Sequence, residues 1–404
     1  MSILVQKFGG SSVATPERIK IVAQRVVDAS KAGDRVVTVV SAVGKTTDLL
    51  IAQAREISTS PPRREMDMLL STGEQISIAL LAMAIHELGH DVVSLTGPQA
   101  GISTNTVHTK ARIQQIETTR LMSELEAGRI VIVAGFQGIN DKDDITTLGR
   151  GGSDTTAVGL AAALGAKVCE IFTDVDGVYT ADPRIVKTAR KLQDVSYGEM
   201  LEMASLGAVV LQPRSVELAS LHGVDIQVRS SFNYNEGTYV REERMIEKDM
   251  VVVGAAHDAD VAKVVLVGVP DLPGVAATLF ERLGESNVSA DMIVQTNRGE
   301  GRTDILFTVD VDDLEPTRSI AEGLRDELGA ETVQVDDAVA KVSIVGTGVA
   351  NNPAVPARMF RALAERAINV EVIATSEIKI SCLIQQDQVE VAVRTIHDAF
   401  NLGG

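Results

Sequence analysis

Short apolar runs alternate with longer segments of helical periodicity through the first 232 residues of the chain. Short apolar runs predict buried strands, and apolar residues that recur every three or four positions predict helices. The expected strands are Ile3–Phe8, Arg35–Ser41, Asp91–Leu95, Arg129–Ala134, Val168–Thr173 and Asp225–Val228. The helical patterns between them include Met66–Leu88, Thr109–Glu126 and Gly198–Ala204. This alternation predicts an α/β domain with a mostly parallel sheet that is covered by helices on both faces.

The C-terminal part of the chain repeats itself. Ala262-Lys263-Val264 recurs as Ala340-Lys341-Val342, and each copy continues as strand, loop, helix, strand, strand, helix. A set of apolar positions recurs with them: Val275, Ala277, Phe280 and Leu283 match Val355, Ala357, Phe360 and Leu363. Each unit is therefore expected to be a small ferredoxin-like α+β module. A pair of such modules favours a regulatory role, with a structural or oligomerising tail as the alternative.

The expected domain limits come from these patterns. The polar, turn-rich segment 233–237 is expected to end the first domain, which covers 1–232. A connector over 233–260 then leads to modules at 261–335 and 336–404. Because small sheets have edge strands that need covering, modules of two chains are expected to pair.

Composition excludes several classes of protein. The 404 residues are 45% hydrophobic and carry a net charge of −17, which argues against a nucleic-acid surface. No apolar run approaches membrane-spanning length, and the N-terminus lacks a signal-peptide pattern. Cys169 and Cys382 lie in strand-like runs and are interpreted as buried thiols, and the histidines show no metal-ligand spacing. These features predict a cytoplasmic protein without a dedicated metal site.

The segment Leu148–Thr156 carries the clearest chemistry. Glycines at 149, 151 and 152 allow the backbone to approach a ligand, and a helix start adds unpaired N–H donors. Arg150 offers a planar fork for a carboxylate or phosphate, and Asp154 adds a carboxylate. This combination suits an anionic ligand that also bears a cationic group. The alternative is an ordinary turn in which Ser153 or Asp154 caps the helix.

A second glycine turn comes after the first expected strand. Lys7 stands at the end of that strand, before Gly9 and Gly10, and Thr15-Pro16-Glu17 is a typical helix start. Open α/β sheets bind ligands at such strand ends, and a lysine there suits a phosphate. A solvated strand end is the alternative. Gly44-Lys45-Thr46 resembles the end of a P-loop, but the glycine that a P-loop requires five residues earlier is Val39.

Two further segments are candidates for ligand contacts. Phe172–Arg184 leaves a strand through a hydroxyl and a carboxylate, and its tyrosine and arginine suit a nucleotide with acidic groups near Mg²⁺. Asp176-Gly177 is also an ordinary turn signal. Glu74 opens an apolar helix, where it either interacts with the helix dipole or binds an amino group.

Taken together, these motifs resemble those of the aspartate kinase family. The resemblance rests on Lys7–Val13, Ser71–Glu74, Gly135–Gly138, Leu148–Thr156 and Phe172–Arg184, and on the paired modules, which resemble ACT domains. It covers essentially the whole chain. It implies an amino-acid-kinase domain, a three-layer α/β/α structure, that transfers the γ-phosphoryl of ATP to the β-carboxylate of L-aspartate with Mg²⁺. The product, 4-phospho-L-aspartate, opens the biosynthesis of lysine, threonine, methionine and diaminopimelate.

The resemblance also implies roles for single residues. Lys7, Arg150 and Asp154 would be catalytic. Aspartate would be bound by Ser41, Thr47, Glu74, Arg150, Gly151, Gly152 and Ser153. The nucleotide would be bound by Lys7, Phe8, Gly9, Gly10, Thr173, Asp174, Tyr179, Asp182 and Arg184. Lysine or threonine would bind the modules at Asp271, Gly274, Asp291, Gln295, Val355, Asn369, Val370, Ser376 and Glu377.

Three further expectations concern assembly and departures from the family pattern. The layout resembles the lysine- and threonine-regulated type, so a homo-oligomer or a partnership with a shorter subunit begun at Met245 or Met250 is expected. Val209 stands where similar enzymes carry lysine, and the second module lacks the family's common glycine and threonine at positions 354 and 356. A glutamate or carbamate kinase of the same fold, and a non-catalytic amino-acid sensor, are the alternative functions.

Overall fold

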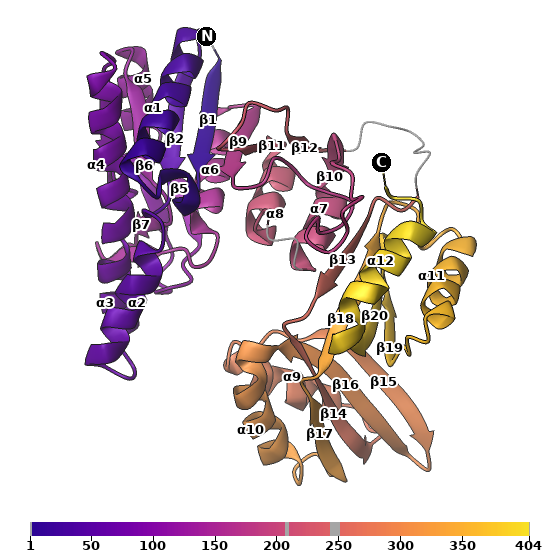
Figure 1. Cartoon of the computed structure of the whole chain (residues 1–404). Helices are drawn as coiled ribbons and strands as arrows, with labels where there is room; N and C mark the ends of the chain where they lie inside the picture. Colours follow the sequence, from indigo (N-terminus) through magenta and orange to yellow (C-terminus); the bar gives the residue numbers. More distant parts are fainter. Residues whose placement is uncertain (1, 207–209, 243–250, 404) are drawn as a thin grey trace. The chain divides into compact units, whose positions relative to one another are not determined.

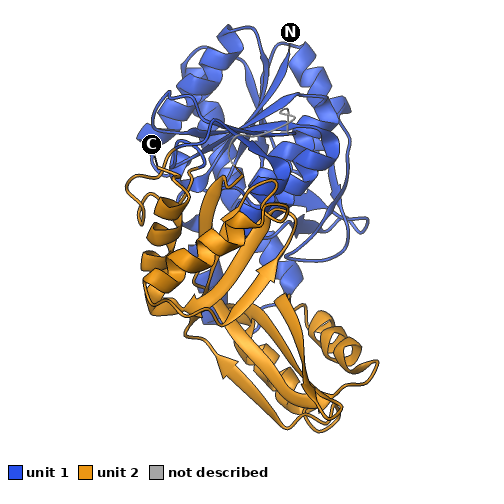
Figure 2. Cartoon of the chain, turned by 90° about the vertical axis from the view of Figure 1, so that its right-hand side faces the viewer, with its two compact units in different colours: residues 1–178, 191–205, 209–246 blue, residues 179–190, 206–208, 247–404 orange. Residues whose placement is uncertain are grey.

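The computed structural model describes residues 2–206, 210–242 and 251–403 (Figure 1). The chain forms two compact units. The first contains residues 1–178, 191–205 and 209–246, and the second contains 179–190, 206–208 and 247–404 (Figure 2). The second unit thus takes a short segment, 179–190, out of the middle of the first.

The first unit is built on an eight-stranded sheet of order β10-β12-β11-β9-β1-β2-β6-β3. Its strands are β1 (Ile3–Phe8), β2 (Arg35–Val40), β3 (Val92–Leu95), β6 (Ile130–Ala134), β9 (Val168–Thr173), β10 (Asp194–Ser196), β11 (Asp225–Ser230) and β12 (Thr238–Arg241). All neighbours are parallel except β11 and β12. The predicted fold is therefore confirmed. The predicted end at 232 differs, because residues 233–237 form the turn between β11 and β12 inside this sheet.

Helices cover both faces of the sheet. On one face α1 (Pro16–Lys31) and α4 (Thr72–Glu87) share a buried core with β1, β2 and β6, formed by Phe8, Val26 and Leu81 among others. α6 (Gly152–Leu164) contacts β1, β2 and β9, and it packs on α8 (Pro213–His222), which contacts α7 (Tyr197–Ser205). The helix start predicted at Thr15 is confirmed, since its side chain accepts a hydrogen bond from Arg18 N at 3.4 Å.

The helix predicted over 66–88 is broken. α3 (Arg63–Leu70) ends before Ser71, and α4 begins at Thr72. The Gln137 side chain donates a hydrogen bond to the Ser71 carbonyl (2.8 Å), and this contact fixes the junction between the two helices. By length and composition alone, the stretch 63–87 is long and apolar enough to cross a membrane, and 44% of its most apolar window is buried in the structure.

The helix predicted over 109–126 is wrong in its first half. Residues 113–116 form strand β5 (Ile113–Ile116), and only α5 (Thr119–Glu126) is helical. β5 joins a small four-stranded sheet of order β5-β4-β7-β8, with β4 (Ile102–Thr104), β7 (Gln137–Ile139) and β8 (Ile145–Thr147). Thr109 has φ of 68°, a left-handed conformation that interrupts any helix there.

The second unit contains two four-stranded antiparallel sheets, as the repeat predicts. The first module has strand order β15-β16-β14-β17 and the second β13-β18-β20-β19. Their strands are β13 (Gly254–Asp258), β14 (Val261–Pro270), β15 (Asp291–Gly299), β16 (Arg302–Asp310), β17 (Thr332–Asp336), β18 (Val339–Val345), β19 (Val372–Thr375) and β20 (Lys379–Gln385). Their helices are α9 (Val275–Glu285), α10 (Leu314–Leu324), α11 (Ala354–Glu365) and α12 (Val389–Ala399).

The first module is inserted into the second. β13 precedes the whole first module in the chain, yet it pairs with β18 of the second. The predicted connector over 233–260 therefore contains two strands, β12 and β13, that belong to different sheets. Segment 179–190 also joins the second module. Ala181 and Val186 lie in its core, and Thr180 accepts a hydrogen bond from Ala255 N and donates to Leu402 O.

The two modules contact each other through equivalent residues. A shared core contains Val261 with its repeat partner Val339, and further residues from both modules: Met292, Val294, Leu306, Val372, Ala374 and Leu383. The lysines of the repeat cross over. Lys341 of the second module pairs with Asp291 of the first at 2.7 Å, and Lys263 of the first pairs with Glu371.

Candidate active site

Strand alternation places Lys7 and Phe8 on opposite faces of the central sheet. Phe8 is fully buried against α1 and α4 and stacks on Phe172, with ring centroids 4.6 Å apart. Lys7 faces α6, and its ammonium lies 2.6 Å from the Asp154 carboxylate. Both side chains of this pair are about nine-tenths buried, at 11% and 9% exposed. The structure thus brings the predicted residues Lys7 and Asp154 together, whereas the Phe8 side chain lies in the core on the opposite face.

The glycine turn after β1 joins three strand ends. Gly9 N donates to the carbonyl of Phe172 at the end of β9 (3.3 Å), and Ser41 N donates to the carbonyl of Phe8 (3.1 Å). Gly44 N donates in turn to Gly10 O (3.1 Å). The turn is therefore fixed between the carboxyl ends of β9 and β2, where parallel sheets bind ligands.

The second predicted turn opens α6. Gly151 is its N-cap residue and has φ of 70°, which favours glycine. Gly152, Ser153 and Asp154 form the first turn, and Ser153 and Asp154 are buried. Arg150 is exposed, and the ion pairs of the described residues do not include it. Arg150 directly precedes the N-cap Gly151, and a helix start favours an anion.

Glu74 is a buried carboxylate in the first turn of α4. It is 3% exposed, and its Oε1 accepts a hydrogen bond from Ala42 N at 3.1 Å. Its Oε2 is buried and has no hydrogen-bond partner among the described residues. Burial raises the pKa of Glu74 to about 7, although the hydrogen bonds from backbone N–H groups oppose this shift. An orphaned carboxylate oxygen of this kind suits a ligand ammonium.

The remaining residues that were predicted to bind the substrate lie at the neighbouring strand end. Ser41 comes directly after β2, and Thr47 lies in the first turn of α2 (Thr46–Ile57); both are partly buried. Asp48 in the same turn is exposed. Ser41 and Ala42 follow β2 directly. Ser41 N bonds to the Phe8 carbonyl and Ala42 N bonds to Glu74, so Ser41 and Glu74 lie at the same edge of the sheet as Lys7.

The predicted nucleotide segment is divided between the two units. Thr173 and Asp174 end β9 in the first unit, and the Thr173 hydroxyl donates to Asp174 at 3.0 Å. Tyr179, Asp182 and Arg184 belong to the second unit. Asp182 is paired there with Arg184 (2.7 Å), and the hydrogen bonds and charge of Arg184 hold the pKa of Asp182 below its usual value despite burial. The described first unit brings only Thr173 and Asp174 beside the Gly9 turn.

The predicted effector residues of the first module are also separated. Asp271 N donates to Gly301 O at one end of β16, next to the Pro270–Arg302 pair. Asp291 pairs with Thr308 at the other end of that strand. Six residues at about 3.4 Å each put roughly 20 Å between these ends, too far for one amino acid to contact both in a single chain. Gly274 is the left-handed N-cap of α9, and Gln295 is exposed midway along β15.

In the second module, one predicted effector residue is part of the core. Val355 is 5% exposed and packs in the core of the module, where it also lines a pocket of about 240 Å³ together with Asn352, Ala354 and Arg358. Asn369 and Glu377 are exposed, and Val370 and Ser376 are partly buried. Ser376 closes the turn before β20, with its N–H donating to Lys379 O (2.9 Å). Val209, Met245 and Met250 lie outside the described residues, as do the predictions that rest on them.

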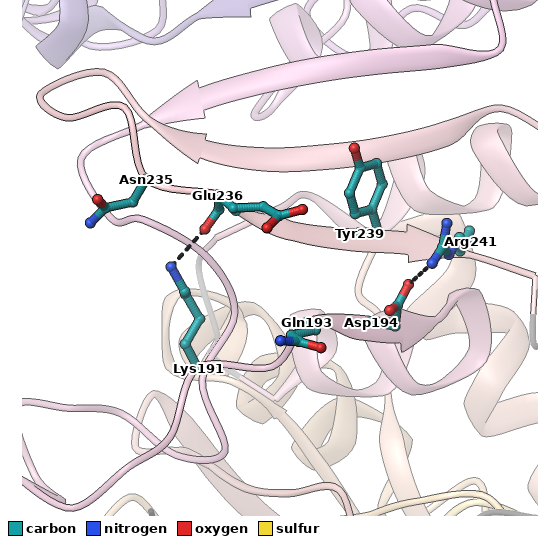
Figure 3. Close-up of a pocket in the computed structure, with 8 residues that line it drawn as sticks. Lys191, Gln193, Asp194, Asn235, Glu236, Tyr239 and Arg241 are labelled. Carbon is teal, nitrogen blue, oxygen red and sulfur yellow. Dashed lines mark hydrogen bonds and ion pairs between the residues drawn. The ribbon is translucent and has the colours of Figure 1, made fainter.

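A separate pocket of about 360 Å³ lies at the β10–β12 edge of the first unit (Figure 3). It is lined by Lys191, Gln193, Asp194, Asn235, Glu236, Gly237, Tyr239 and Arg241. Figure 3 shows Lys191 reaching the Glu236 carbonyl (2.7 Å) and Arg241 reaching Asp194. Lys191 also pairs with Asp176 at 3.3 Å. Its charges are thus balanced locally, and the predicted site residues do not line it.

Asp67 was not among the residues predicted from the sequence, yet it is fully buried in α3, close to the segment that precedes Arg150. Its signal was available, because a carboxylate interrupts the apolar face of the 66–88 pattern. Buried carboxylates without a partner are rare in cores, so such an interruption predicts a local network of donors.

Comparison with known proteins gives the same assignment for both parts of the chain. Residues 2–230 match the Amino acid kinase family, and residues 263–329 and 342–400 each match the ACT domain. The aspartokinase of Bacillus sp. (strain MGA3) is 49% identical over 404 residues, which is all of this chain and 98% of that protein. The chain belongs to the aspartokinase family. Its enzyme class is accordingly that of a kinase that phosphorylates aspartate.

Solved structures of this family resemble the whole chain. E. coli aspartokinase III in complex with aspartate and ADP (R-state) matches with a TM-score of 0.85 at 26% identity, covering 98% of this chain and 99% of that one. The same enzyme in complex with lysine and aspartate (T-state) matches with a TM-score of 0.78 at 26% identity, with the same coverage. The fold of an aspartokinase with two ACT modules is thus common to both states of that relative and to this chain.

Proposed function

We propose that this aspartokinase transfers the γ-phosphoryl of ATP to the β-carboxylate of L-aspartate. The reaction takes place at the carboxyl edge of the sheet, in a site made by Lys7, Glu74, Arg150 and Asp154. The observation that carries this is the buried Lys7–Asp154 pair beside the Gly9 turn, with the orphaned Glu74 oxygen at the neighbouring strand end. One group is a fixed cation, and the other is a fixed acceptor. Together they suit a substrate that has both negative charge and an ammonium.

In this proposal the residues divide between phosphate and amino acid. Lys7 neutralises charge on the transferring phosphoryl group, and the N–H groups of Gly9 and Gly10 lie at the same strand end. Arg150 clamps the α-carboxylate of aspartate with two parallel hydrogen bonds. Glu74 accepts from the α-ammonium, with Ser41, Thr47 and the first turn of α6 around the rest of the substrate. Thr173 and Asp174 contribute to the nucleotide side.

The chemistry requires no general base. A β-carboxylate with a pKa of about 4 is already ionised at neutral pH and is the nucleophile as it stands. Catalysis then depends on positioning and on neutralising charge, as in other phosphoryl transfers. Asp154 therefore acts by holding the Lys7 ammonium in place, at 2.6 Å, and not by removing a proton.

Mg²⁺ is the expected companion of ATP. It is usually held by one or two carboxylates and by the substrate phosphates. Asp174 fits this requirement because it is an exposed carboxylate at the end of β9, next to the Gly9 turn. When bound there, the ion would supply charge neutralisation for the phosphates.

Regulation is proposed to reside in the modules. E. coli aspartokinase III has been solved with lysine, and its two states match this chain. We infer that lysine, threonine or both inhibit by binding one arrangement of the ACT modules better than another. Because Asp271 and Asp291 lie at opposite ends of one module, an effector that contacts both needs modules from two chains, either a second copy or a shorter in-frame subunit. The protein is proposed to work in the cytoplasm, in the biosynthesis of lysine, threonine, methionine and diaminopimelate.

A hydroxamate assay tests the proposal directly. The full-length protein is incubated with Mg-ATP and L-aspartate, with glutamate and carbamate as alternative acceptors. Hydroxamate formed with aspartate and not with glutamate or carbamate supports the assignment, and inhibition of that reaction by lysine or threonine supports the regulatory part. No acyl phosphate with any acceptor, together with effector binding in a calorimeter, would instead identify a non-catalytic amino-acid sensor.

A further inference from the structure

The carboxylate of Asp67 is the most completely buried charge near the site, with no exposed surface. It has three partners from two other parts of the chain. His108 Nδ1 lies 2.7 Å from Oδ2, the Thr147 hydroxyl donates to Oδ1 at 2.5 Å, and Thr109 N donates to both oxygens at 3.1 Å. A buried carboxylate is stable only with such a set of donors, so these contacts fix one another's positions.

The loop that Asp67 holds is closed at its base and bent at its tip. Asn105 N donates to Arg112 O at 3.0 Å, and Ala111 N donates to Thr147 O at 2.9 Å. At the tip, Thr109 has φ of 68°. This left-handed conformation is energetically unfavourable for a residue other than glycine. The hydrogen bonds from its N–H to Asp67 compensate for that strain.

This loop supports the turn that carries Arg150. A Cβ atom placed on Gly149, whose φ is 80°, would lie 3.1 Å from the Thr109 carbonyl oxygen. Thr147 is bound to Asp67 directly and lies three residues before Arg150 in the chain. The Leu148 carbonyl between them accepts from Arg214 at 3.0 Å. Thr147 and Leu148, which lead into Gly149, are therefore each held by a hydrogen bond with a distant part of the chain.

Asp67 is also tied to the other half of the amino-acid site. Ser71 N donates to the Asp67 carbonyl at 3.1 Å, which ends α3 immediately before α4. Glu74 stands in the first turn of α4. Any residue at position 67 would accept this backbone bond, so what is particular to Asp67 is its side chain, which anchors the last turn of α3 to the support of the Arg150 turn. That helix leads through Ser71 directly into the turn that carries Glu74.

We propose that Asp67 is a positioning residue that sets the spacing between the carboxylate clamp at Arg150 and the ammonium acceptor at Glu74. This inference rests on the proposed aspartate site. Loss of the Asp67 carboxylate misaligns the turn that binds aspartate. The Lys7 and Gly9 side of the site keeps its own hydrogen bonds to β9 and β2. The defect is therefore selective for the amino acid.

The test compares Asp67→Asn with a matched variant, Thr104→Val. Thr104 is 2% exposed and its hydroxyl bonds to Thr146 at 2.6 Å in the same small sheet, without contacting Asp67. We expect Asp67→Asn to raise the KM for aspartate roughly tenfold or more, because buried donors lose their charged acceptor, while the KM for ATP changes less than about twofold. Thr104→Val should lower the melting temperature without this split.

Two further measurements keep the inference testable. If Asp67→Asn does not fold, Thr147→Val removes a single one of its hydrogen bonds and should shift aspartate KM in the same direction by a smaller factor. Calorimetric titration with aspartate measures the same defect without turnover, so it holds even if the wild type proves inactive in the hydroxamate assay and the proposed reaction fails. Equal losses of aspartate and ATP affinity, or unchanged aspartate affinity in a folded variant, would overturn the positioning role.

Discussion

The two units of this chain use buried lysines differently. In the kinase unit, Lys7 is held by Asp154 near the end of a strand, beside the glycine turn at Gly9. In the repeat unit, Lys341 is only 5% exposed and pairs with Asp291, with Asp258 3.8 Å away. The same ion-pair chemistry thus prepares a site in one unit and joins two modules in the other. The position of the lysine along its strand differs between these two roles, since Lys7 is the next-to-last residue of β1 and Lys341 is the third of the seven residues of β18.

The repeat unit has its arrangement in two copies. Asn287 and Ala367 both have left-handed backbones, with φ of 57° and 55°, and mark the same place in the two modules. Four residues later stand Asp291 and Glu371, which bind the other module's lysine. Burial raises the pKa of Asp291, but the hydrogen bond and charge of Lys341 outweigh it, so the net shift is downward. Asp291, which was predicted to bind the effector, is therefore already paired with Lys341.

The largest expected effect separates the two kinds of lysine. Lys7→Ala should reduce turnover about 100-fold or more, because a preorganised cation at the transferring phosphoryl is lost. Lys263→Ala, its control in the repeat unit, should leave turnover without effector unchanged. Steady-state rates of both variants check this, and near-normal turnover of Lys7→Ala would remove Lys7 from catalysis.

Arg150→Lys should raise the KM for aspartate roughly tenfold, since a lysine cannot make the two parallel hydrogen bonds of the guanidinium. The KM for ATP should change little. Initial rates with each substrate varied in turn measure both constants. A loss confined to ATP would show that Arg150 binds phosphate.

The pH dependence of aspartate binding should track the ionisation of Glu74. Its pKa of about 7 means that the ionised form, which the ammonium needs, grows as pH rises. The KM for aspartate should therefore fall roughly tenfold between pH 6 and pH 8, as the ionised fraction rises. Glu74→Gln should have a high KM that is flat over this range. A wild-type profile that is equally flat would contradict the role.

Glu74 also makes a prediction about stability. Its folded pKa is raised above the ordinary value of 4.5, so the folded state holds the proton more tightly than the unfolded state. This stabilisation is fully present below pH 4.5 and is lost as pH rises through about 7. Glu74→Gln should consequently gain stability relative to the wild type across that window, which thermal melts at several pH values would reveal.

In the repeat unit, Lys341→Ala should destabilise the module contact by about 1–2 kcal/mol, because it leaves Asp291 beside a buried core without its cation. Turnover without effector should not change. A double-mutant cycle with Asp291→Ala in chemical denaturation measures the pair. A coupling energy near zero would mean that the shared apolar core alone holds the modules together.

The smallest expected effect is that of Gln295→Ala. Gln295 is exposed on β15, so the change should leave stability and basal turnover as they are while relieving inhibition by lysine or threonine. Inhibition curves for both amino acids, alone and together, test it. Val333→Ala at a partly buried position of the same sheet is the comparison, since it weakens packing without touching the surface of β15.

The sequence predicted the features that depend on local pattern. The six strands, the start of α1 and the turns before α6 are set by apolar runs, capping residues and glycines that act within a few positions. Lys7 and Asp154 were both identified, although no local rule says that they pair, and parallel pairing of β1 with β9 and packing of α6 brought them together.

The features that the sequence could not predict depend on distant partners. Residues 109–117 have a helical pattern, but Thr109 is drawn into a left-handed turn by Asp67, 42 residues earlier in the chain. Residues 254–258 resemble a connector because their strand partner, β18, lies beyond a whole module. The separation of Asp271 from Asp291 similarly results from strand register, which the repeat pattern does not fix.

The insertion of one module into the other has a consequence for the order of folding during synthesis. β13 leaves the ribosome 81 residues before its partner begins, from Asp258 to Val339. At about 5–20 residues per second it waits roughly 4 to 16 seconds as an unpaired strand. Closing so long a loop is slow unless its ends are brought together first. Folding of the first module does this, since β14 and β17 are neighbours in its sheet and lead directly from β13 and into β18. Folding of the first module thus brings β13 and β18 together and allows the second module to complete its sheet.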